Sequence, residues 1–253
     1  SRNIKPKKSP EDSVSVIIPV CNEAGNIPAL FERIPNMGLW TELIFVEGLS
    51  VDGSEETINN EMANHPDRKS KFLKQPGVGK ADAVFHGLDH ASGSILMILD
   101  ADLCVEPEEL TKFYRAIQCG MGEFIFGERR LDPNQRNSMP VLNQWGNQFF
   151  AWAISKFVNH PIQDALCGTK VVKKKDYQSI REITQSYWPD DPFGDFTLIF
   201  GASQSGLKFC ALPVAYHERT YGKSKIRPWA EGWKLVKLLF MFALARKNSL
   251  SST

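Results

Sequence analysis

Several features that would assign a function directly are missing from this sequence of 253 residues. Its five cysteines form no C-x-x-C pair and show no metal-binding spacing, which predicts free thiols in a reducing, cytoplasmic compartment. No signal peptide and no apolar run of membrane-spanning length is present, so we expect no transmembrane helix. A formal net charge of +1 argues against nucleic acid as a partner.

The composition is that of an ordinary folded protein, with 42% hydrophobic and 23% charged residues. We predict a flexible basic arm over residues 1–12, one domain over 13–226, an amphipathic helix over 227–247 and a short tail over 248–253.

Apolar and polar residues alternate in a way that predicts strands and helices in turn. In the first hundred residues this alternation predicts an α/β fold, with a mostly parallel sheet flanked by helices. The predicted strands are 13–20 (stopped by Pro19), 41–47, 71–75, 94–100, 123–130 and 168–174, with an extended segment over 207–222 broken at Pro213; the predicted helices are 27–34, 55–64, 79–91, 142–158 and 175–183.

Polar clusters follow three of these strands, at residues 21–23, 47–52 and 100–102. In parallel sheets ligands bind at the carboxyl ends of the strands. We therefore expect the three clusters to converge on one site.

The last cluster contains a D-x-D pair, Asp100 and Asp102, directly after the buried run "ILMIL". Two carboxylates that face one point suit a hard divalent cation, Mg or Mn, that also takes phosphate oxygens. A solvated turn is the alternative for such a short motif. The position at a sheet edge favours a metal–phosphate site.

Four stretches in this order, "SVIIPVCNEAGNI", "VEGLSVDGS", "GVGKADAVFHGLDHASGSILMILDADL" and "RTYGKSK", resemble family 2 inverting glycosyltransferases of the GT-A fold. The similarity is to the polyprenol-phosphate and membrane-lipid branch and covers about residues 13–240. It implies a UDP- or GDP-sugar donor, a divalent metal on the D-x-D pair, and a lipid acceptor at the cytoplasmic face of a membrane.

The same resemblance implies roles for residues on the donor side. Glu47 takes the place of the first Asp of the family's D-D-G-S loop, and its extra methylene leaves the identity of the base open; Gly48 and Leu49 also depart from that loop. Cys104 stands where the branch usually has a polar residue that sometimes helps the metal. The implied nucleotide-sugar ligands are Pro19, Asn22, Glu23, Glu47, Asp52, Lys80 and Asp100, with Asp100 and Asp102 on the metal.

On the acceptor side the resemblance implies a phosphate clamp and two candidate catalytic carboxylates. Asp164 has the better positional match, whereas Asp195 is better placed if the acceptor is a hydroxyl that needs a general base. Asp190 and Asp191 are interpreted as a solvated turn. The implied phosphate-binding residues are Arg129, Lys170, Arg219, Ser224 and Lys225.

The helix over 227–247 combines tryptophan, lysine and arginine with an apolar stripe. This suits a helix in a membrane interface, and equally a helix packed on the domain core; both hold if each face serves one purpose. The stripe comprises Trp229, Trp233, Val236, Leu239 or Phe240, and Ala243.

Two further functions stay open on the sequence alone. One keeps the sugar donor but transfers to a soluble glycan or protein hydroxyl. The other is a sugar-nucleotide-binding module without catalysis, which only the changes at Gly48 and Leu49 favour. His86 and His90 lie four apart on a predicted helix, and without an H-E-x-x-H pattern they are interpreted as structural.

Overall fold

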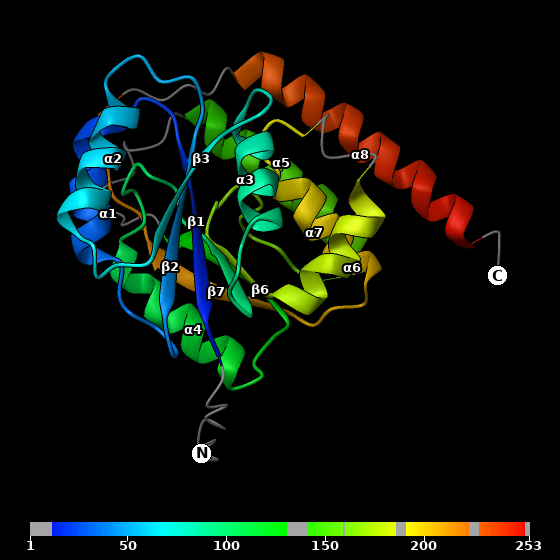
Figure 1. Ribbon diagram of the computed structural model, residues 1–253. Helices are drawn as coiled ribbons and strands as arrows, with labels where there is room; N and C mark the ends of the chain where they lie inside the picture. Colours follow the sequence, from blue (N-terminus) through cyan, green and yellow to red (C-terminus); the bar gives the residue numbers. More distant parts are fainter. Residues whose placement is uncertain (1–11, 131–140, 159, 186–190, 223–227, 251–253) are drawn as a thin grey trace.

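A seven-stranded sheet forms the centre of the computed structural model, with helices on both faces (Figure 1). The structure describes residues 12–130, 141–158, 160–185, 191–222 and 228–250. Nearly all of the predicted arm therefore lies outside the described residues.

The strand order is β3-β2-β1-β4-β6-β5-β7. Among these strands, β6 is antiparallel to both of its neighbours, and the other pairs are parallel. The predicted mostly parallel sheet is confirmed. The strands are β1 (Val14–Val20), β2 (Thr41–Glu47), β3 (Ser70–Lys74), β4 (Ile95–Ile98), β5 (Phe124–Arg130), β6 (Lys170–Lys173) and β7 (Phe209–Ala215).

The helices separate into two layers. One face carries α1 (Ile27–Arg33), α2 (Ser54–Asn64) and α4 (Leu110–Gln118), with the short 3-10 turns η1 (Ala24–Asn26) and η2 (Pro107–Glu109). The other face carries α3 (Lys80–Asp89), α5 (Val141–Val158), α6 (Lys174–Thr184), α7 (Asp195–Gln204) and α8 (Pro228–Leu250). Figure 1 shows α1 and α2 on one side of the sheet and α3, α6 and α7 on the other.

Side chains of β1 alternate between the hydrophobic clusters under these two layers. Val16 and Ile18 belong to the cluster under α1 and α4, whereas Ile17 belongs to the cluster under α3. Successive side chains of a strand point to opposite faces, so a strand with apolar residues on both faces contributes to two cores at once.

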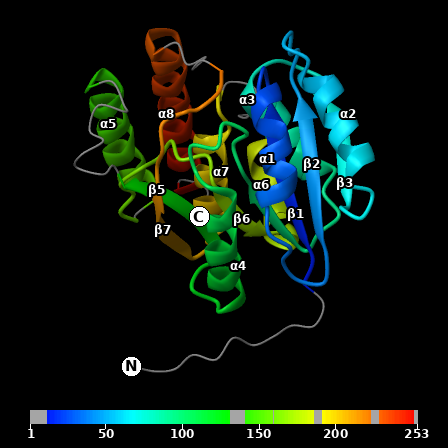
Figure 2. The same cartoon turned by 90° about the vertical axis from the view of Figure 1, so that its left-hand side faces the viewer.

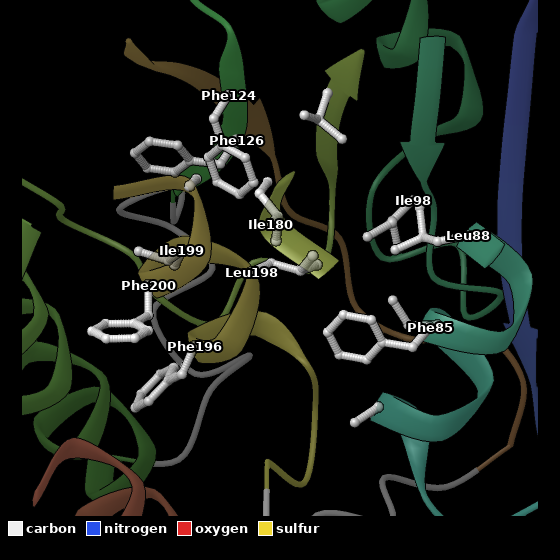
Figure 3. Packing of buried hydrophobic residues seen from close by; sticks show 14 of the residues in the cluster. Phe85, Leu88, Ile98, Phe124, Phe126, Ile180, Phe196, Leu198, Ile199 and Phe200 are labelled. Carbon is white, nitrogen blue, oxygen red and sulfur yellow. The ribbon is translucent and has the colours of Figure 1, made fainter. Parts of the chain in front are cut away.

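Helix α7 packs in the middle of the second layer. Figure 3 shows Leu198 of α7 between Phe85 of α3 and the two phenylalanines of β5, Phe124 and Phe126. No helix was predicted at α7 or α4 from the sequence. α7 is apolar all round, so its pattern lacks the polar face by which a surface helix is recognised.

Neither proline ends its strand, contrary to the prediction. Pro19 lies within β1, and Pro213 lies within β7. The backbone of Ile17 faces β4, because Ile17 O accepts a hydrogen bond from Leu99 N. Pro19 is two residues further along, so its backbone nitrogen points to the same side, where β4 has already ended. Pro213 is in an edge strand that pairs only with β5. In both places the missing N–H removes no ladder hydrogen bond.

Candidate active site

The loops after β1 and β2 are tied to each other at the carboxyl edge of the sheet. Asn22 N donates to Ser50 Oγ at 2.8 Å, and Ala24 N donates to Asp52 Oδ2 at 3.0 Å. These contacts bring the first two of the predicted polar clusters together.

Side chains of both of these clusters support the loop after β2. Glu47 Oε1 accepts from Ser50 N at 2.6 Å, and Asn22 Oδ1 accepts from Val51 N at 2.7 Å. Between them Leu49 has a φ of +56°, a backbone conformation unusual for a residue with a branched side chain. Glu47 is buried, so the role that the sequence predicts for it, a contact to the base, stays a prediction.

The D-x-D pair lies in a turn after β4, because the strand ends at Ile98. Asp100 forms an ion pair with Lys80 at 2.6 Å, and Asp102 forms one with Arg219 at 2.8 Å. A Cβ added at Gly168 would lie 2.2 Å from Asp100 Oδ2, so the backbone at Gly168 passes directly beside this carboxylate.

Lys80 lies where several of the acidic groups converge. Burial alone lowers the pKa of its ammonium group, but the carboxylates of Asp100 and Asp195 outweigh that effect, and the pKa of Lys80 is raised. Conversely, burial raises the pKa of Asp100, yet Lys80 and Lys170 hold it below its usual range. The pair is fully ionised at neutral pH.

Arg219 joins the first polar cluster to the third. Its Nη1 donates to Glu23 Oε1 at 2.6 Å, and its Nη2 donates to Asp102 Oδ2 at 2.8 Å. The three predicted clusters therefore converge, as expected. Of the rest of the predicted clamp, Ser224 and Lys225 lie outside the described residues.

Arg129 and Asp164 form a bidentate pair at the end of β5. Arg129 Nε donates to Asp164 Oδ2 at 2.5 Å, and Nη2 donates to Oδ1 at 2.7 Å. Burial raises the pKa of Asp164, but the guanidinium group outweighs it and holds the pKa below the usual range. This carboxylate is a poor proton acceptor at neutral pH.

Lys170 and Asp195 form the most deeply buried ion pair of the site, with side chains 2% and 6% exposed. Because β6 runs antiparallel to β4, its first residue, Lys170, lies at the carboxyl edge of β4. The ammonium group also donates to Cys167 O at 2.6 Å. Both groups are thus occupied by each other rather than turned toward an acceptor.

Asp191 is buried, which corrects the prediction of a solvated turn. It accepts from Phe193 N at 3.0 Å and from Thr197 N at 2.8 Å, at the start of α7. Thr197 is in the first turn of α7, where backbone N–H groups have no partner within the helix, so the carboxylate supplies one. Asp190 lies outside the described residues.

The residues present fit a hard divalent cation. Asp100 and Asp102 offer carboxylate oxygens and are both partly exposed, and within the described part of the chain no third His, Cys, Asp or Glu joins them in a cluster able to hold a metal. Two carboxylates that leave positions for water and phosphate oxygens are typical of magnesium sites. The rings of His86 and His90 lie 4.3 Å apart, and His90 Nδ1 lies 2.8 Å from His86 O, consistent with the structural interpretation.

Two tyrosines at the site were not identified from the sequence. Tyr221 donates to Asp52 Oδ2 at 3.2 Å, and the guanidinium group of Arg129 lies 5.2 Å from the ring centroid of Tyr216. Their proximity in sequence to Arg219 was the available signal.

Comparison with known proteins agrees with the resemblance stated above. The model of the family "Glycosyl transferase family 2" matches residues 15–181. A dolichol-phosphate mannosyltransferase of Pyrococcus furiosus is 33% identical over 133 residues, which are 52% of this chain and 37% of the relative. An undecaprenyl-phosphate 4-deoxy-4-formamido-L-arabinose transferase of Aeromonas hydrophila is 28% identical over 221 residues, which are 84% of this chain and 62% of the relative. The chain therefore spans less than two thirds of the length of these two relatives.

A solved structure shares the fold. Glucosyl-3-phosphoglycerate synthase from Mycobacterium tuberculosis, in complex with Mg²⁺ and uridine diphosphate, superposes with a TM-score of 0.70 over 91% of this chain and 79% of that one. At 14% sequence identity this likeness is evidence for the architecture alone.

Proposed function

The chain belongs to glycosyl transferase family 2 and has the GT-A fold, and from that premise we propose that it transfers a sugar from a nucleoside diphosphate to the phosphate of a membrane lipid, with inversion. The names of the two relatives above specify dolichol phosphate and undecaprenyl phosphate, which are lipids of this class.

The observation that carries the proposal is the state of the two candidate catalytic carboxylates. Asp164 is paired with Arg129, and Asp195 is paired with Lys170. A hydroxyl acceptor must lose a proton as it attacks, which requires an available base. A lipid phosphate is already anionic at neutral pH and requires only charge compensation and positioning. The pairing therefore favours a phosphate acceptor.

The nucleotide-sugar donor is assigned to the part of the site formed by the D-x-D pair and the loops after β1 and β2. Asp100 and Asp102 would hold Mg²⁺ or Mn²⁺, which supplies positive charge to the departing diphosphate. Lys80 and Arg219 each contact one of these carboxylates and are the cations best placed to exchange that contact for a phosphate oxygen. The residues on the predicted nucleotide side come from the carboxyl ends of β1 and β2 and from the loops that follow them: Pro19, Asn22, Glu23, Glu47 and Asp52.

The acceptor phosphate is assigned to Arg129, with Ser224 and Lys225 as further contacts. In the reaction an oxygen of the acceptor phosphate forms a bond to the anomeric carbon of the sugar. The bond from that carbon to the donor diphosphate breaks, and its electron pair leaves with the diphosphate. Lys170 is not assigned to the acceptor phosphate, because its ammonium group is buried in an ion pair with Asp195. We assign it the role of stabilising the charge of Asp195.

A donor screen followed by matched acceptors tests the function. UDP- and GDP-sugars are compared with Mn²⁺ by thermal shift, and the donor that stabilises the protein is offered to a polyprenyl phosphate and to the same polyprenol without phosphate. We expect glycosylation of the phosphate only. Equal transfer to the alcohol, or to a soluble glycan or 3-phosphoglycerate in place of the lipid, would contradict the proposal.

A membrane surface is the proposed location of the acceptor, and α8 supports it. Leu235, Leu238 and Phe242 of α8 are buried, whereas Trp233 and Phe240 are 74% and 67% exposed. At 100° per residue these two sets lie on opposite sides of the helix, so packing on the core leaves the second apolar side uncovered. Of the predicted stripe, Trp233 and Phe240 are exposed and Leu239 is buried, and a role of this stripe at a membrane stays a prediction.

Neighbouring helix α5 extends this surface. Phe149 and Trp152 are more than half exposed, and α5 and α8 share one hydrophobic cluster, side by side in Figure 2. Exposed lysines lie near the aromatic side chains, at 156, 234 and 237. Exposed tryptophan and phenylalanine with lysine suit the headgroup region of an anionic bilayer. Within the described residues, no helix is both long and apolar enough to cross a membrane.

We predict that the double variant Trp233→Glu/Phe240→Glu loses at least about tenfold in partition onto phosphatidylglycerol vesicles, because two apolar side chains are replaced by anions. Co-sedimentation measures the partition, and turnover of a short, water-soluble prenyl phosphate should stay unchanged. Leu39→Glu, at an exposed apolar residue of another region, is the matched control. Equal binding by both variants would contradict the membrane assignment.

A further inference from the structure

A glycine-rich turn precedes Lys80, the first residue of α3, and ends at Gly79. Gly79 has a φ of +95°, a backbone conformation that residues with a side chain rarely adopt. With glycine at positions 77 and 79 the turn has little rigidity of its own, because glycine restricts the backbone least. The position of the Lys80 side chain therefore depends on the contacts that hold this turn.

Two side chains hold the turn. The carboxamide of Gln75 donates from Nε2 to Gly77 O at 3.0 Å and to Gly79 O at 3.2 Å. Asp82, in the first turn of α3, accepts from Gly77 N at 2.8 Å. Gln75 directly follows β3, so its hydrogen bonds tie the turn to the carboxyl edge of the sheet.

Gln75 also packs against the loop after β2. Its backbone N donates to Glu47 O at 2.9 Å, and its Oε1 would lie 2.4 Å from a Cβ added at Gly48. Gly48 does not have a positive φ, so its backbone conformation does not require glycine. The space occupied by the carboxamide of Gln75 does require it. This is a physical reason for one of the departures from the D-D-G-S loop.

Lys80 carries the charge that the turn positions. Its Nζ lies 2.6 Å from Asp100 Oδ1, and a Cβ added at Gly168 would lie 2.7 Å from the same nitrogen. The ammonium group is thus confined between the D-x-D pair and the backbone at Gly168. A small displacement of the turn before α3 would move this group away from a donor phosphate.

We propose that Gln75 is a positioning residue for Lys80: its carboxamide fixes the turn over residues 76–79, and Gly48 leaves the room that the carboxamide needs. The inference rests on the proposed function, since it takes Lys80 to bind a phosphate of the nucleotide-sugar donor. Gln75 acts through the turn and Lys80, without touching the donor itself.

A double-variant cycle tests this dependence. UDP and GDP are each titrated by calorimetry into the unaltered protein with Mn²⁺, and the tighter binder is used throughout. Gln75→Met keeps the length of the side chain but removes its N–H donors, and we expect the Kd to rise about fivefold, against about tenfold in Lys80→Ala. The double variant should lose little more than Lys80→Ala alone. Gln118→Met, which removes a carboxamide bonded to Tyr114 on α4, is the matched control.

Substitution of Gly48 tests the same contact from the other side. The methyl group of Gly48→Ala would displace the carboxamide of Gln75, so the Kd should rise as it does in Gln75→Met. In a Gln75→Ala background the space is free, and Gly48→Ala should cause no further loss. Hydrogen exchange measured by mass spectrometry reports on the turn without any ligand, and the amides of residues 77–80 should exchange faster in Gln75→Met.

A normal Kd in Gln75→Met would overturn the inference, and so would losses from Gln75→Met and Lys80→Ala that multiply in the double variant. A weaker Kd with unchanged hydrogen exchange would mean that Gln75 contacts the nucleotide directly, and would overturn it too. A lower melting temperature with a normal Kd would show a merely structural role, with the same consequence. If the unaltered protein binds neither UDP nor GDP with Mn²⁺, the proposed function fails instead, and hydrogen exchange in Gln75→Met still tests the turn.

Discussion

Asp102→Ala is expected to lower turnover by about a thousandfold, equivalent to ~4 kcal/mol of transition-state stabilisation, and to abolish the thermal shift that Mn²⁺ and nucleotide produce together. The reason is that Asp102 is one of two carboxylates available to the metal. The free energy of unfolding without ligand should change little, because Arg219 keeps its second partner, Glu23.

Differential scanning fluorimetry with and without Mn²⁺ and nucleotide checks the binding part, and a radiolabelled donor checks turnover. Asp89→Ala is the matched control, since Asp89 pairs with Arg181 on the protein surface. An Asp102→Ala protein with a normal Mn²⁺-dependent shift would rule out the metal assignment.

Lys170→Met is expected to have the largest effect on stability. It removes the cation from a pair whose two side chains are almost completely buried, and leaves the buried carboxylate of Asp195 without its ion-pair partner. Breaking a buried ion pair in this way costs about 3–5 kcal/mol, which corresponds to a fall of roughly 10 °C in the melting temperature of a domain of this size.

Urea denaturation measures this loss. Lys175→Met, at an exposed lysine on α6, should change the free energy of unfolding by less than about 0.5 kcal/mol. The double variant Lys170→Met/Asp195→Leu should recover most of the stability, because an apolar pair of similar volume removes the uncompensated charge.

A variant of the Lys170–Asp195 pair distinguishes a structural role of Asp195 from a catalytic one. If Asp195 is a structural partner, Asp195→Asn should lose stability along with activity. If Asp195→Asn keeps its stability and loses turnover alone, Asp195 acts as a general base and the acceptor is a hydroxyl.

Local patterns were sufficient for most of the secondary structure. Strand β2 was predicted with the same bounds, 41–47, because a short apolar run between polar residues is typical of a buried strand. The two prolines misled the prediction, because a local rule cannot tell whether a strand lies at an edge or extends beyond its neighbour. Helix α7 was missed since it is buried on all sides and shows no amphipathic period.

The sequence predicted where the candidate site lies, but it did not predict which side chains form ion pairs there. Parallel strands place their carboxyl ends at one edge, so the convergence of Glu23, Asp52 and Asp102 followed from the order of elements. The partners did not follow. Asp164 and Asp195 were predicted as candidate catalytic carboxylates without partners being assigned to them, and the structure pairs each with a cation.

What the sequence by itself determined is most of the order of strands and helices, the family, and the edge of the sheet where the candidate site lies. These follow from short-range periodicity and from motifs a few residues long. Only the tertiary structure decided which charges meet: Arg219 contacts Glu23 from 196 residues away and Asp102 from 117. Such pairings depend on how helices and loops pack in three dimensions, and no local pattern encodes them.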